Sequence, residues 1–411
     1  MAKNYSSKNI IITSSNFPKG SACANYLNLF CKGIVLSGLS AEVFILKGYF
    51  LQGQKIDDAK KNFTDYGVNY SYLGFTNRSS KKILKIIGDI YGTFSLARLL
   101  LSFFKNRKDI TIFTYNNEFY HSLLINCYCK LIGIKIISFV PEYYDISEFS
   151  GNLFHRLRWY SFLLNFNYII RLSDKLIVFS QYIKDKYIEK KYPESKILIQ
   201  PNLTDFDFWY KNDSEIIFTV GYSGTPYKKD GIEDLLTAIS ILRKKDVAVN
   251  VVIIGDVVNE KSIIPSLRGL CENLGIGNLV TFTGHVTLEE VRDWLNKCNI
   301  LAITRPNIVQ AVAGFPTKIG EYFACKKTVL STKIGDVSHY FRNKDEIVFA
   351  DSDNPQSIAD NIEWIINNQE TSKKIALNGH LKAKELLNYK NKVLLNLLEK
   401  LQMIIILMLE I

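Results

Sequence analysis

Short apolar runs alternate along the chain with stretches in which apolar residues recur every three or four positions. The runs predict strands buried on both faces, and the stretches between them, such as 232–243 and 288–296, predict amphipathic helices. We expect strands at residues 9–13, 41–46, 70–74, 110–114, 135–140, 175–180, 196–200, 216–222, 249–255, 279–284, 300–304, 328–331 and 346–349. This alternation predicts an α/β protein with two doubly wound parallel sheets.

The polar, turn-rich segment 201–213 lies between the two series of strands. We therefore expect an N-terminal domain over residues 1–203, a C-terminal domain over 204–386 and a helical tail over 387–411. Ligands of open α/β sheets bind beyond the carboxyl ends of the strands, which predicts a ligand clamped between the two domains.

Positive charge is concentrated in the first half. Residues 1–200 hold 27 Lys and Arg against 14 Asp and Glu, whereas the remaining residues hold 24 against 26. The segment Arg78–Lys108 carries eight basic residues and one aspartate, with apolar residues at helical spacing. This pattern is typical of a helix on an anionic membrane surface, and a core-facing helix with a solvated face explains it equally well. No nucleic-acid-binding signature accompanies the charge, so we expect no nucleic acid partner.

We expect no signal peptide and no membrane-spanning segment, because no stretch reaches about 18 apolar residues. The seven scattered cysteines indicate buried thiols in a reducing compartment.

The segment Val312–Thr332 has the features of an anion site. Gly314 allows close approach of the backbone, and Pro316 suits the first turn of a helix. The helix then begins beside Phe315 and Thr317 with free N–H groups, which suit a diphosphate. Glu321 follows, and its carboxylate can accept hydrogen bonds from ribose hydroxyls. An ordinary helix with a surface glutamate is the alternative.

The segment Thr219–Ile239 predicts a strand, a glycine turn and a helix. Gly221 and Gly224 allow the backbone to approach a ligand, and Lys228 or Lys229 could meet a diphosphate as a point charge. Solvated lysines on an ordinary strand–turn–helix connection are the alternative.

The order of these segments resembles the glycosyltransferase family 4 of the GT-B fold. The resemblance rests on VGYSGTPYKKDGIEDLL, VVIIGD, LVTFTGHVTLEEVRDWL, LAITRP and AGFPTKIGEYFACKKTVLSTKIGD, and more loosely on FPKGSACANYLNLFCKG and residues 173–209. It implies two Rossmann-like domains facing across a cleft, and transfer of a sugar from a nucleotide diphosphate sugar. The segment AGFPTKIGEY is most similar to the corresponding segment of transferases that build bacterial surface polysaccharides.

The resemblance also implies roles for individual residues. Glu321 matches the ribose-binding second glutamate of a conserved pair, and Ala313 stands where the first glutamate contacts the donor sugar. Thr225 takes the place of an arginine on the diphosphate, Lys229 matches the accompanying lysine, and Arg305 could supply the missing charge or pair with a neighbouring acid. The expected donor-binding residues are Gly20, Gly224, Thr225, Lys229, Arg305, Gly314, Phe315, Thr317 and Glu321.

Glu142 ends a predicted strand where many family members carry a histidine or an acid near the acceptor. It could act as a base or orient the acceptor hydroxyl, or simply lie at a helix entry. We expect Glu142, Lys229 and Glu321 to be the catalytic residues.

Asp351 and Asp353 form the Asp-x-Asp pattern with which another class of transferases binds a metal. We expect instead that an acid of this pair is the N-cap of a helix. We predict a retaining enzyme with no metal or other cofactor. Its expected partners are a nucleotide sugar donor, a lipid-linked or glycan acceptor and the anionic inner face of a bacterial membrane, where it would lie on the cytoplasmic side. A catalytically weak binding subunit and a nucleotide-sugar epimerase are the alternatives.

Overall fold

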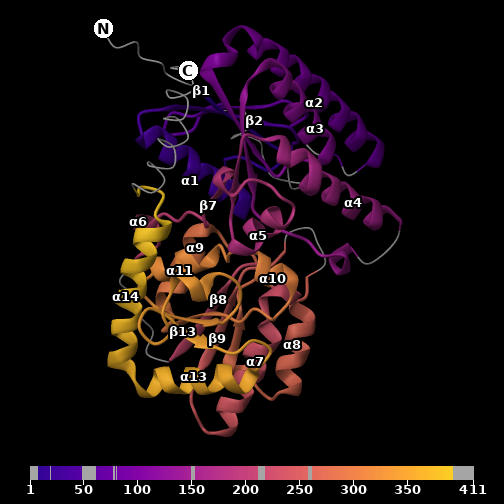
Figure 1. Cartoon of the computed structure of the whole chain (residues 1–411). Coiled ribbons are helices and arrows are strands. Elements are labelled where there is room, and N and C mark those ends of the chain that lie inside the picture. Colours follow the sequence, from indigo (N-terminus) through magenta and orange to yellow (C-terminus); the bar gives the residue numbers. More distant parts are fainter. Residues whose placement is uncertain are drawn as a thin grey trace. The chain divides into compact units, whose positions relative to one another are not determined.

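The computed structural model describes residues 8–18, 20–48, 62–76, 79, 81–149, 153–211, 218–257 and 262–391 (Figure 1). The chain forms two compact units, one of Met1–Pro201 with Tyr389–Ile411 and the other of Asn202–Asn388. Of the predicted tail over 387–411, residues 392–411 lie outside the described residues, and Leu387 is the last residue of α14.

The first unit contains a parallel sheet in the order β3-β2-β1-β4-β5-β6-β7. Its central strand pairs in register with both neighbours, so that Ile11 lies between Val43 and Phe113. The strands are β1 (Lys8–Thr13), β2 (Ser40–Ile45), β3 (Asn69–Tyr72), β4 (Ile110–Tyr115), β5 (Lys135–Val140), β6 (Lys175–Val178) and β7 (Ile197–Ile199).

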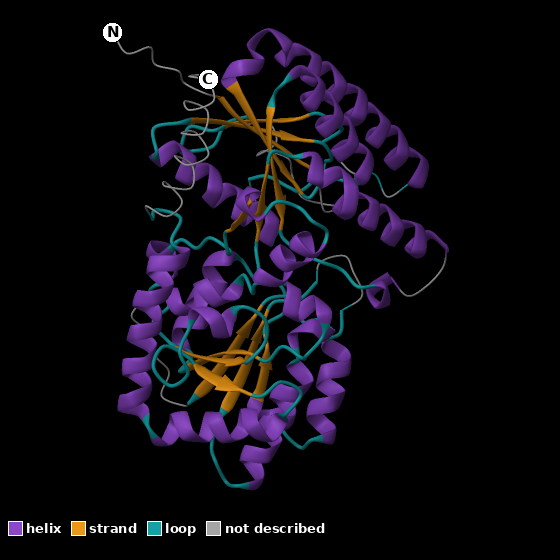
Figure 2. Cartoon of the chain, in the orientation of Figure 1, coloured by secondary structure: helices purple, strands orange, loops and turns teal. Residues whose placement is uncertain are grey.

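Helices cover both faces of this sheet (Figure 2). They are α1 (Ala22–Leu36), α2 (Lys82–Ser102), α3 (Phe119–Ile132), α4 (Leu153–Leu164) and α5 (Gln181–Glu189), with short 3-10 or π turns at Phe103–Asp109, Ile146–Phe149, Asn165–Ile169, Ile170–Leu172 and Glu194–Lys196. The two covered faces explain the continuous apolar runs of the strands.

The second unit contains a parallel sheet in the order β10-β9-β8-β11-β12-β13. The strands are β8 (Thr219–Ser223), β9 (Asn250–Ile254), β10 (Val280–Phe282), β11 (Ile300–Ile303), β12 (Thr328–Thr332) and β13 (Val348–Ala350). The helices are α6 (Phe206–Trp209), α7 (Ile232–Lys244), α8 (Ile264–Asn273), α9 (Leu288–Lys297), α10 (Val309–Ala313), α11 (Lys318–Ala324), α12 (Val337–Tyr340), α13 (Pro355–Asn367) and α14 (Gln369–Leu387), with short turns at Lys228–Asp230 and Gly277–Leu279.

The predicted fold class is confirmed: both units are doubly wound parallel sheets, and each expected strand is present within a few residues of its predicted bounds. The order reverses beside the first strand of each unit, between β1 and β4 and between β8 and β11. These reversal points are where doubly wound sheets bind ligands.

One expectation about an individual segment is wrong. Asn354, not an aspartate, caps α13, because its side chain accepts a hydrogen bond from the Ser357 N–H at 3.0 Å. Asp353 instead accepts one from the Asn307 N–H at 2.9 Å. In addition, the helical stretch Ile83–Asp109 is long and apolar enough to cross a membrane by length and composition. A core helix can pass the same test, and Leu96 and Leu100 of this stretch do pack into the core of the first unit.

Candidate functional site

The centre of the candidate site is Lys318, which begins α11 in the second unit. Its Nζ lies 2.9 Å from Oδ1 of Asp230 and donates a hydrogen bond of 2.8 Å to the Tyr222 hydroxyl. The same ammonium lies 4.0 Å from the centre of the Tyr222 ring. Lys318 is 9% exposed and Asp230 is 3% exposed, so this is a buried ion pair supported by a cation–π contact.

Asp230 is held from several directions. Its Oδ2 accepts a hydrogen bond from the Tyr227 N–H, and its carbonyl accepts one from the Thr304 hydroxyl at 3.1 Å. Burial opposes ionisation of the carboxyl, but the positive charges of Lys318, Arg305 and Lys229 outweigh it and hold the pKa of Asp230 below its ordinary value. The carboxylate is therefore charged at neutral pH.

Three cations surround this one carboxylate, so the cluster of Lys229, Arg305 and Lys318 keeps an excess of positive charge. Burial lowers the pKa of Lys318, and the nearby charges of Arg305 and Lys229 lower it further, whereas Asp230 acts in the opposite direction. Gly224 follows β8 and Arg305 follows β11, which places the cluster at the reversal point of the sheet. A net-positive crevice at this position suits an anionic ligand.

Glycine is required at the turn that covers Lys318. Gly224 has φ +121°, and a Cβ there would lie 3.3 Å from Nζ of Lys318. At Gly231, with φ +63°, a Cβ would lie 1.8 Å from the Thr304 carbonyl oxygen. The backbone therefore reaches the cluster where a side chain would not fit.

The chain entering α11 offers hydrogen-bond donors to the same place. Arg305 donates to the Gly314 carbonyl at 3.3 Å, and Asn202 donates to the Phe315 carbonyl at 2.7 Å. Among the described residues, the backbone N–H groups of Phe315 and Thr317 have no acceptor. The ring of Phe315 packs edge-to-face on Tyr340 in the core, so this residue serves the site through its backbone.

Glu321 lies three residues after Lys318 on the same helix. Burial raises the pKa of its carboxyl to about 7, although the positive charge of Lys318 acts in the opposite direction. No group in the described part of the chain donates a hydrogen bond to this carboxylate. Glu321 is thus a desolvated acceptor without a protein partner, beside a cationic cluster.

The structure also describes the two positions that depart from the family pattern. Ala313 is completely buried at the end of α10. Thr225 is half-buried, and its carbonyl accepts a hydrogen bond from the Tyr222 hydroxyl at 3.3 Å. Neither side chain carries a charge, so Lys229, Arg305 and Lys318 are the cations of this site.

Gly20 and Glu142 belong to the first unit. Gly20 has φ +114° in the turn before Ser21, the N-cap of α1. Glu142 follows β5 and accepts a hydrogen bond from the Tyr144 hydroxyl. The structure therefore gathers the predicted donor-binding residues of the second unit around Lys318, and gives these two residues separate positions in the other unit.

Sequence reasoning missed both partners of the buried ion pair. Lys318 and Asp230 are 88 residues apart, and each looks like a surface residue next to a turn. The signal that could have drawn attention to them is their position, since each lies within a segment with anion-binding features.

A second polar cluster lies at the reversal point of the first unit and was also missed. Glu118 accepts hydrogen bonds from Lys47 and, at 2.7 Å, from the Ser14 hydroxyl, and its Oε2 lies 3.2 Å from Nδ1 of His121. Burial opposes ionisation, but His121, Lys47 and Ser14 together lower the pKa of Glu118 to about 2. A carboxylate this acidic is a hydrogen-bond acceptor and a poor base.

Part of this chain is similar in sequence to known proteins. Residues 207–382 match the family described as glycosyl transferases group 1. An uncharacterized glycosyltransferase of Methanocaldococcus jannaschii, MJ1178, is 26% identical over 217 residues, which are 52% of this chain and 56% of that relative. The match thus spans little more than half of the relative.

Solved structures of similar fold cover almost the whole chain. HepE of Anabaena, in complex with UDP, has a TM-score of 0.68 at 16% identity. The alignment covers 96% of this chain and 99% of the HepE chain. Sucrose-phosphate synthase of Thermosynechococcus elongatus has a TM-score of 0.73 at 13% identity. The alignment covers 97% of this chain and 99% of the synthase chain. The fold is therefore similar to that of the GT-B glycosyltransferases, and the match to the group 1 family falls within the second unit.

Proposed function

We propose that this protein is a family 4 glycosyltransferase that moves a sugar from a nucleotide diphosphate sugar to an acceptor. The observation that carries the proposal is the net-positive cluster of Lys229, Arg305 and Lys318 at the reversal point of the second sheet. Open backbone donors and the unpartnered Glu321 adjoin it. HepE of Anabaena, which shares the fold, was solved with UDP and with UDP-glucose, which supports a nucleotide sugar as the donor.

Each group then has a physical role. Lys229 and Arg305 neutralise the diphosphate, and the N–H groups of Phe315 and Thr317 donate to its oxygens. These contacts strengthen as the departing diphosphate gains charge, which lowers the barrier to transfer. Glu321 accepts from the ribose hydroxyls. Lys318 is a positioning residue, because its ammonium is already committed to Asp230 and Tyr222.

The acceptor is proposed to bind in the first unit, where Glu142 orients its hydroxyl and where Gly20 belongs to the turn before α1. We propose retention of anomeric configuration with assistance from the departing phosphate, since a strong base is not required for that course. The proposed setting is bacterial surface polysaccharide synthesis on the cytoplasmic side of the membrane, as the AGFPTKIGEY segment suggests.

Replacing Lys229 by alanine is expected to weaken binding of UDP about tenfold or more, because hydrogen bonds to charged groups contribute about 1.5–3 kcal/mol. Binding of UMP should change less, because it lacks the second phosphate. Calorimetric titration of both nucleotides measures this difference. Lys228→Ala is the matched control, because Lys228 is the exposed neighbour. Equal losses for the two lysines would contradict the assignment.

Transfer is expected to persist in excess chelator, because lysine, arginine and backbone donors replace a metal at the diphosphate. Sugar transfer with and without EDTA, followed by mass spectrometry of the product, tests this expectation. Activity that is lost on chelation and restored by magnesium or manganese would overturn it.

A binding subunit without turnover is the second candidate, favoured by the uncharged Ala313 and Thr225 at positions where the family carries charge. Tight binding of nucleotide sugars with no transfer to any lipid-linked glycan, compared by mass spectrometry with and without the protein, would establish that role instead.

We further propose that α2 and the turn after it dock on an anionic membrane. Apolar side chains on α2 are unusually open to solvent: Ile83 is 73% exposed and Phe94 is 70% exposed. Exposed basic residues accompany them, among them Arg98, Lys105 and Lys108. An apolar face bordered by cations suits the boundary between head groups and acyl chains.

Changing Arg98, Lys105 and Lys108 to glutamate is expected to release the protein from anionic vesicles. Each basic residue near such a surface contributes about 1 kcal/mol, and the attraction weakens with salt because screening shortens its reach to about 10 Å at 0.1 M. Co-sedimentation with phosphatidylglycerol vesicles measures the effect. The control is the same charge change at Lys244, Lys333 and Lys374, which are exposed on the second unit. Vesicle binding equal to that of the parent would place the docking surface elsewhere.

A further inference from the structure

The chain enters the second unit at Asn202, which contacts the candidate site. Pro201 still belongs to the first unit, and Asn202 is the first residue of the second. Asn202 is 5% exposed, and its Nδ2 donates a hydrogen bond of 2.7 Å to the carbonyl oxygen of Phe315, 113 residues further along the chain. This buried amide ties the connection between the two units to the chain that enters α11.

The same connection packs directly on α11. The Thr204 N–H donates to the Leu387 carbonyl at 2.8 Å, and Thr204 pairs with Asn388, the last residue of the second unit. A Cβ on Gly320 of α11 would lie 2.0 Å from Oγ1 of Thr204. The segment 202–204 therefore lies against this helix at a distance that excludes a side chain, where the chain enters and leaves the second unit.

Hydrogen bonds hold three successive carbonyl groups of the chain that enters α11. The Gly314 carbonyl accepts from Arg305 at 3.3 Å, the Phe315 carbonyl accepts from Asn202, and the Pro316 carbonyl accepts from the Ile319 N–H at 3.3 Å. The C=O and the N–H of one trans peptide point in opposite directions, because the peptide is planar. A carbonyl that is held in place therefore also sets the direction of the N–H that follows it.

Asn202 holds the peptide of this run that has no N–H of its own. The Gly314 carbonyl sets the direction of the Phe315 N–H, and the Pro316 carbonyl sets that of the Thr317 N–H. The peptide between them joins Phe315 to a proline, whose ring removes the N–H and fixes φ at about −65°. The direction of one N–H relative to the other therefore depends on how this middle peptide is turned, and the amide of Asn202 sets that turn.

We propose that Asn202 is a positioning residue of the nucleotide site, which aligns the N–H groups of Phe315 and Thr317 on one diphosphate. The inference rests on the proposed function and adds to its donor site a residue of the connection between the units. Hydrogen bonds weaken steeply when the donor angle falls below about 120°, so two donors serve one ligand only if both point at it. A turned middle peptide therefore costs affinity for the diphosphate, although the Asn202 amide binds a carbonyl and not the ligand.

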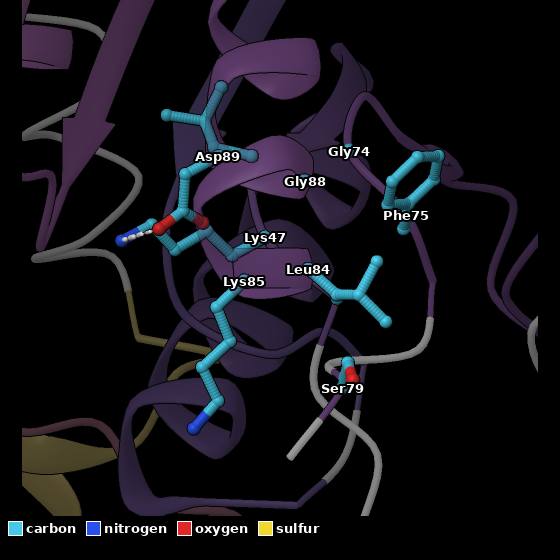
Figure 3. A pocket seen from close by; sticks show the side chains of 10 residues that line it. Lys47, Gly74, Phe75, Ser79, Leu84, Lys85, Gly88 and Asp89 are labelled. Carbon is cyan, nitrogen blue, oxygen red and sulfur yellow. Dashed lines mark ion pairs between the residues drawn. The ribbon is translucent and has the colours of Figure 1, made fainter. Parts of the chain in front are cut away.

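Two hollows of the first unit are unsuited to a diphosphate. The groove between α2 and α3 encloses about 410 Å³, and Asp89 is the only charged residue in its lining. The pocket drawn in Figure 3 holds only about 20 Å³, which is room for about one water. Its Lys47 is paired with Asp89, whose carboxylate lies 3.7 Å from Nζ. A nucleotide titration therefore reports on the second unit and not on these hollows.

Asn202→Leu keeps most of the side-chain volume and removes the hydrogen-bond donor. We expect it to weaken binding of UDP at least fivefold and binding of UMP less than twofold, because UMP has no diphosphate. Calorimetric titration of both nucleotides measures this difference. An unchanged ratio of the two affinities would overturn the proposal.

Asn296→Leu is the matched control for a merely structural effect. Asn296 is completely buried in the same unit, and its Nδ2 donates to the Trp209 carbonyl at 2.8 Å. Its loss should leave the ratio of UDP to UMP affinity as in the parent. Equal changes of this ratio at Asn202 and Asn296 would contradict a specific role of Asn202. Asn202→Ala, which removes the amide without adding an apolar branch, tests the same ratio if the leucine variant does not fold.

Hydrogen exchange tests the alignment without any nucleotide. In the unliganded protein, Asn202→Leu and Asn202→Ala should speed exchange of the Ile319 N–H, which is bonded to the Pro316 carbonyl, at least tenfold relative to Asn296→Leu. Equal exchange in the three variants would show that the amide does not hold this run, and would overturn the proposal. A parent that binds neither nucleotide would instead contradict the proposed function, whereas the exchange result still decides whether Asn202 holds the chain entering α11.

Discussion

Replacing Lys318 by methionine is expected to destabilise the second unit by about 3–5 kcal/mol, because it leaves the Asp230 carboxylate buried without its partner. Asp230 is 3% exposed, and the Lys318 Nζ lies 2.9 Å from its Oδ1. Methionine keeps most of the length and apolar volume of the lysine stem, so the loss reports the charge. Denaturant unfolding at neutral pH measures the change.

The double variant Asp230→Asn with Lys318→Met is the control for this prediction. Removal of both charges should recover most of the lost stability, because the desolvation cost disappears together with the attraction. Nucleotide binding should recover as well, because the double variant removes one positive and one negative charge and leaves Lys229 and Arg305 in place. A single Lys318→Met variant as stable as the parent would show that the pair is not held as the structure has it.

Replacing Glu321 by glutamine is expected to stabilise the unliganded protein above neutral pH and to weaken nucleotide binding. Burial raises the pKa of Glu321 from 4.5 to about 7. Between these values the folded protein binds more protons than the unfolded chain, so its stability falls as the pH rises. At about 1.4 kcal/mol for each pH unit, the folded parent loses up to about 3 kcal/mol by pH 8. Glutamine carries no charge and avoids this loss.

Unfolding of parent and variant at pH 5 and pH 8 measures the stabilising half of this prediction. The two proteins should be similarly stable at pH 5, where Glu321 is largely protonated when folded, and the variant should be the more stable at pH 8. A variant that is less stable than the parent at pH 8 would contradict the desolvated state of the carboxylate.

The binding half is measured by calorimetry with UDP and with its 2′,3′-dideoxy form. Hydrogen bonds to a charged group contribute about 1.5–3 kcal/mol, so at pH 8, where Glu321 is largely ionised, the variant should bind UDP more weakly, by about tenfold or more. The parent should prefer UDP over the dideoxy nucleotide, and the variant should lose that preference. An equal preference in both proteins would show that Glu321 does not meet the ribose. The substitution is thus expected to raise the stability and to lower the nucleotide affinity. This opposition is typical of a charge that destabilises the folded protein and serves to bind a ligand.

Much of the donor site follows from local sequence, because its backbone elements are built from neighbouring residues. The turn at Gly224 and the entry to α11 beside Phe315 and Thr317 are each defined within a few positions. The side chains that charge the site are not local. Asp230 looks like part of a lysine-rich surface turn, and only the packing of α11 against β8 turns it inward to meet Lys318.

The basic segment from Arg78 to Lys108 left two interpretations open, a helix on a membrane surface and a core-facing helix with a solvated face. In α2, Leu96 and Leu100 are buried while Ile83 and Phe94 are largely exposed. Helical spacing cannot distinguish a face that is covered from one that is open. That difference depends on Gly88 and Gly92, whose lack of a side chain brings the helix against the ends of β2 and β3.

By itself, then, the sequence determined the two doubly wound sheets, their strands and the glycine turns, because period and turn chemistry are properties of adjacent residues. Tertiary structure alone decided the buried pair of Asp230 and Lys318, the raised pKa of Glu321 and the cluster around Glu118. Each of these depends on desolvation and on charges that meet across distant segments, and neither quantity exists until the chain has folded.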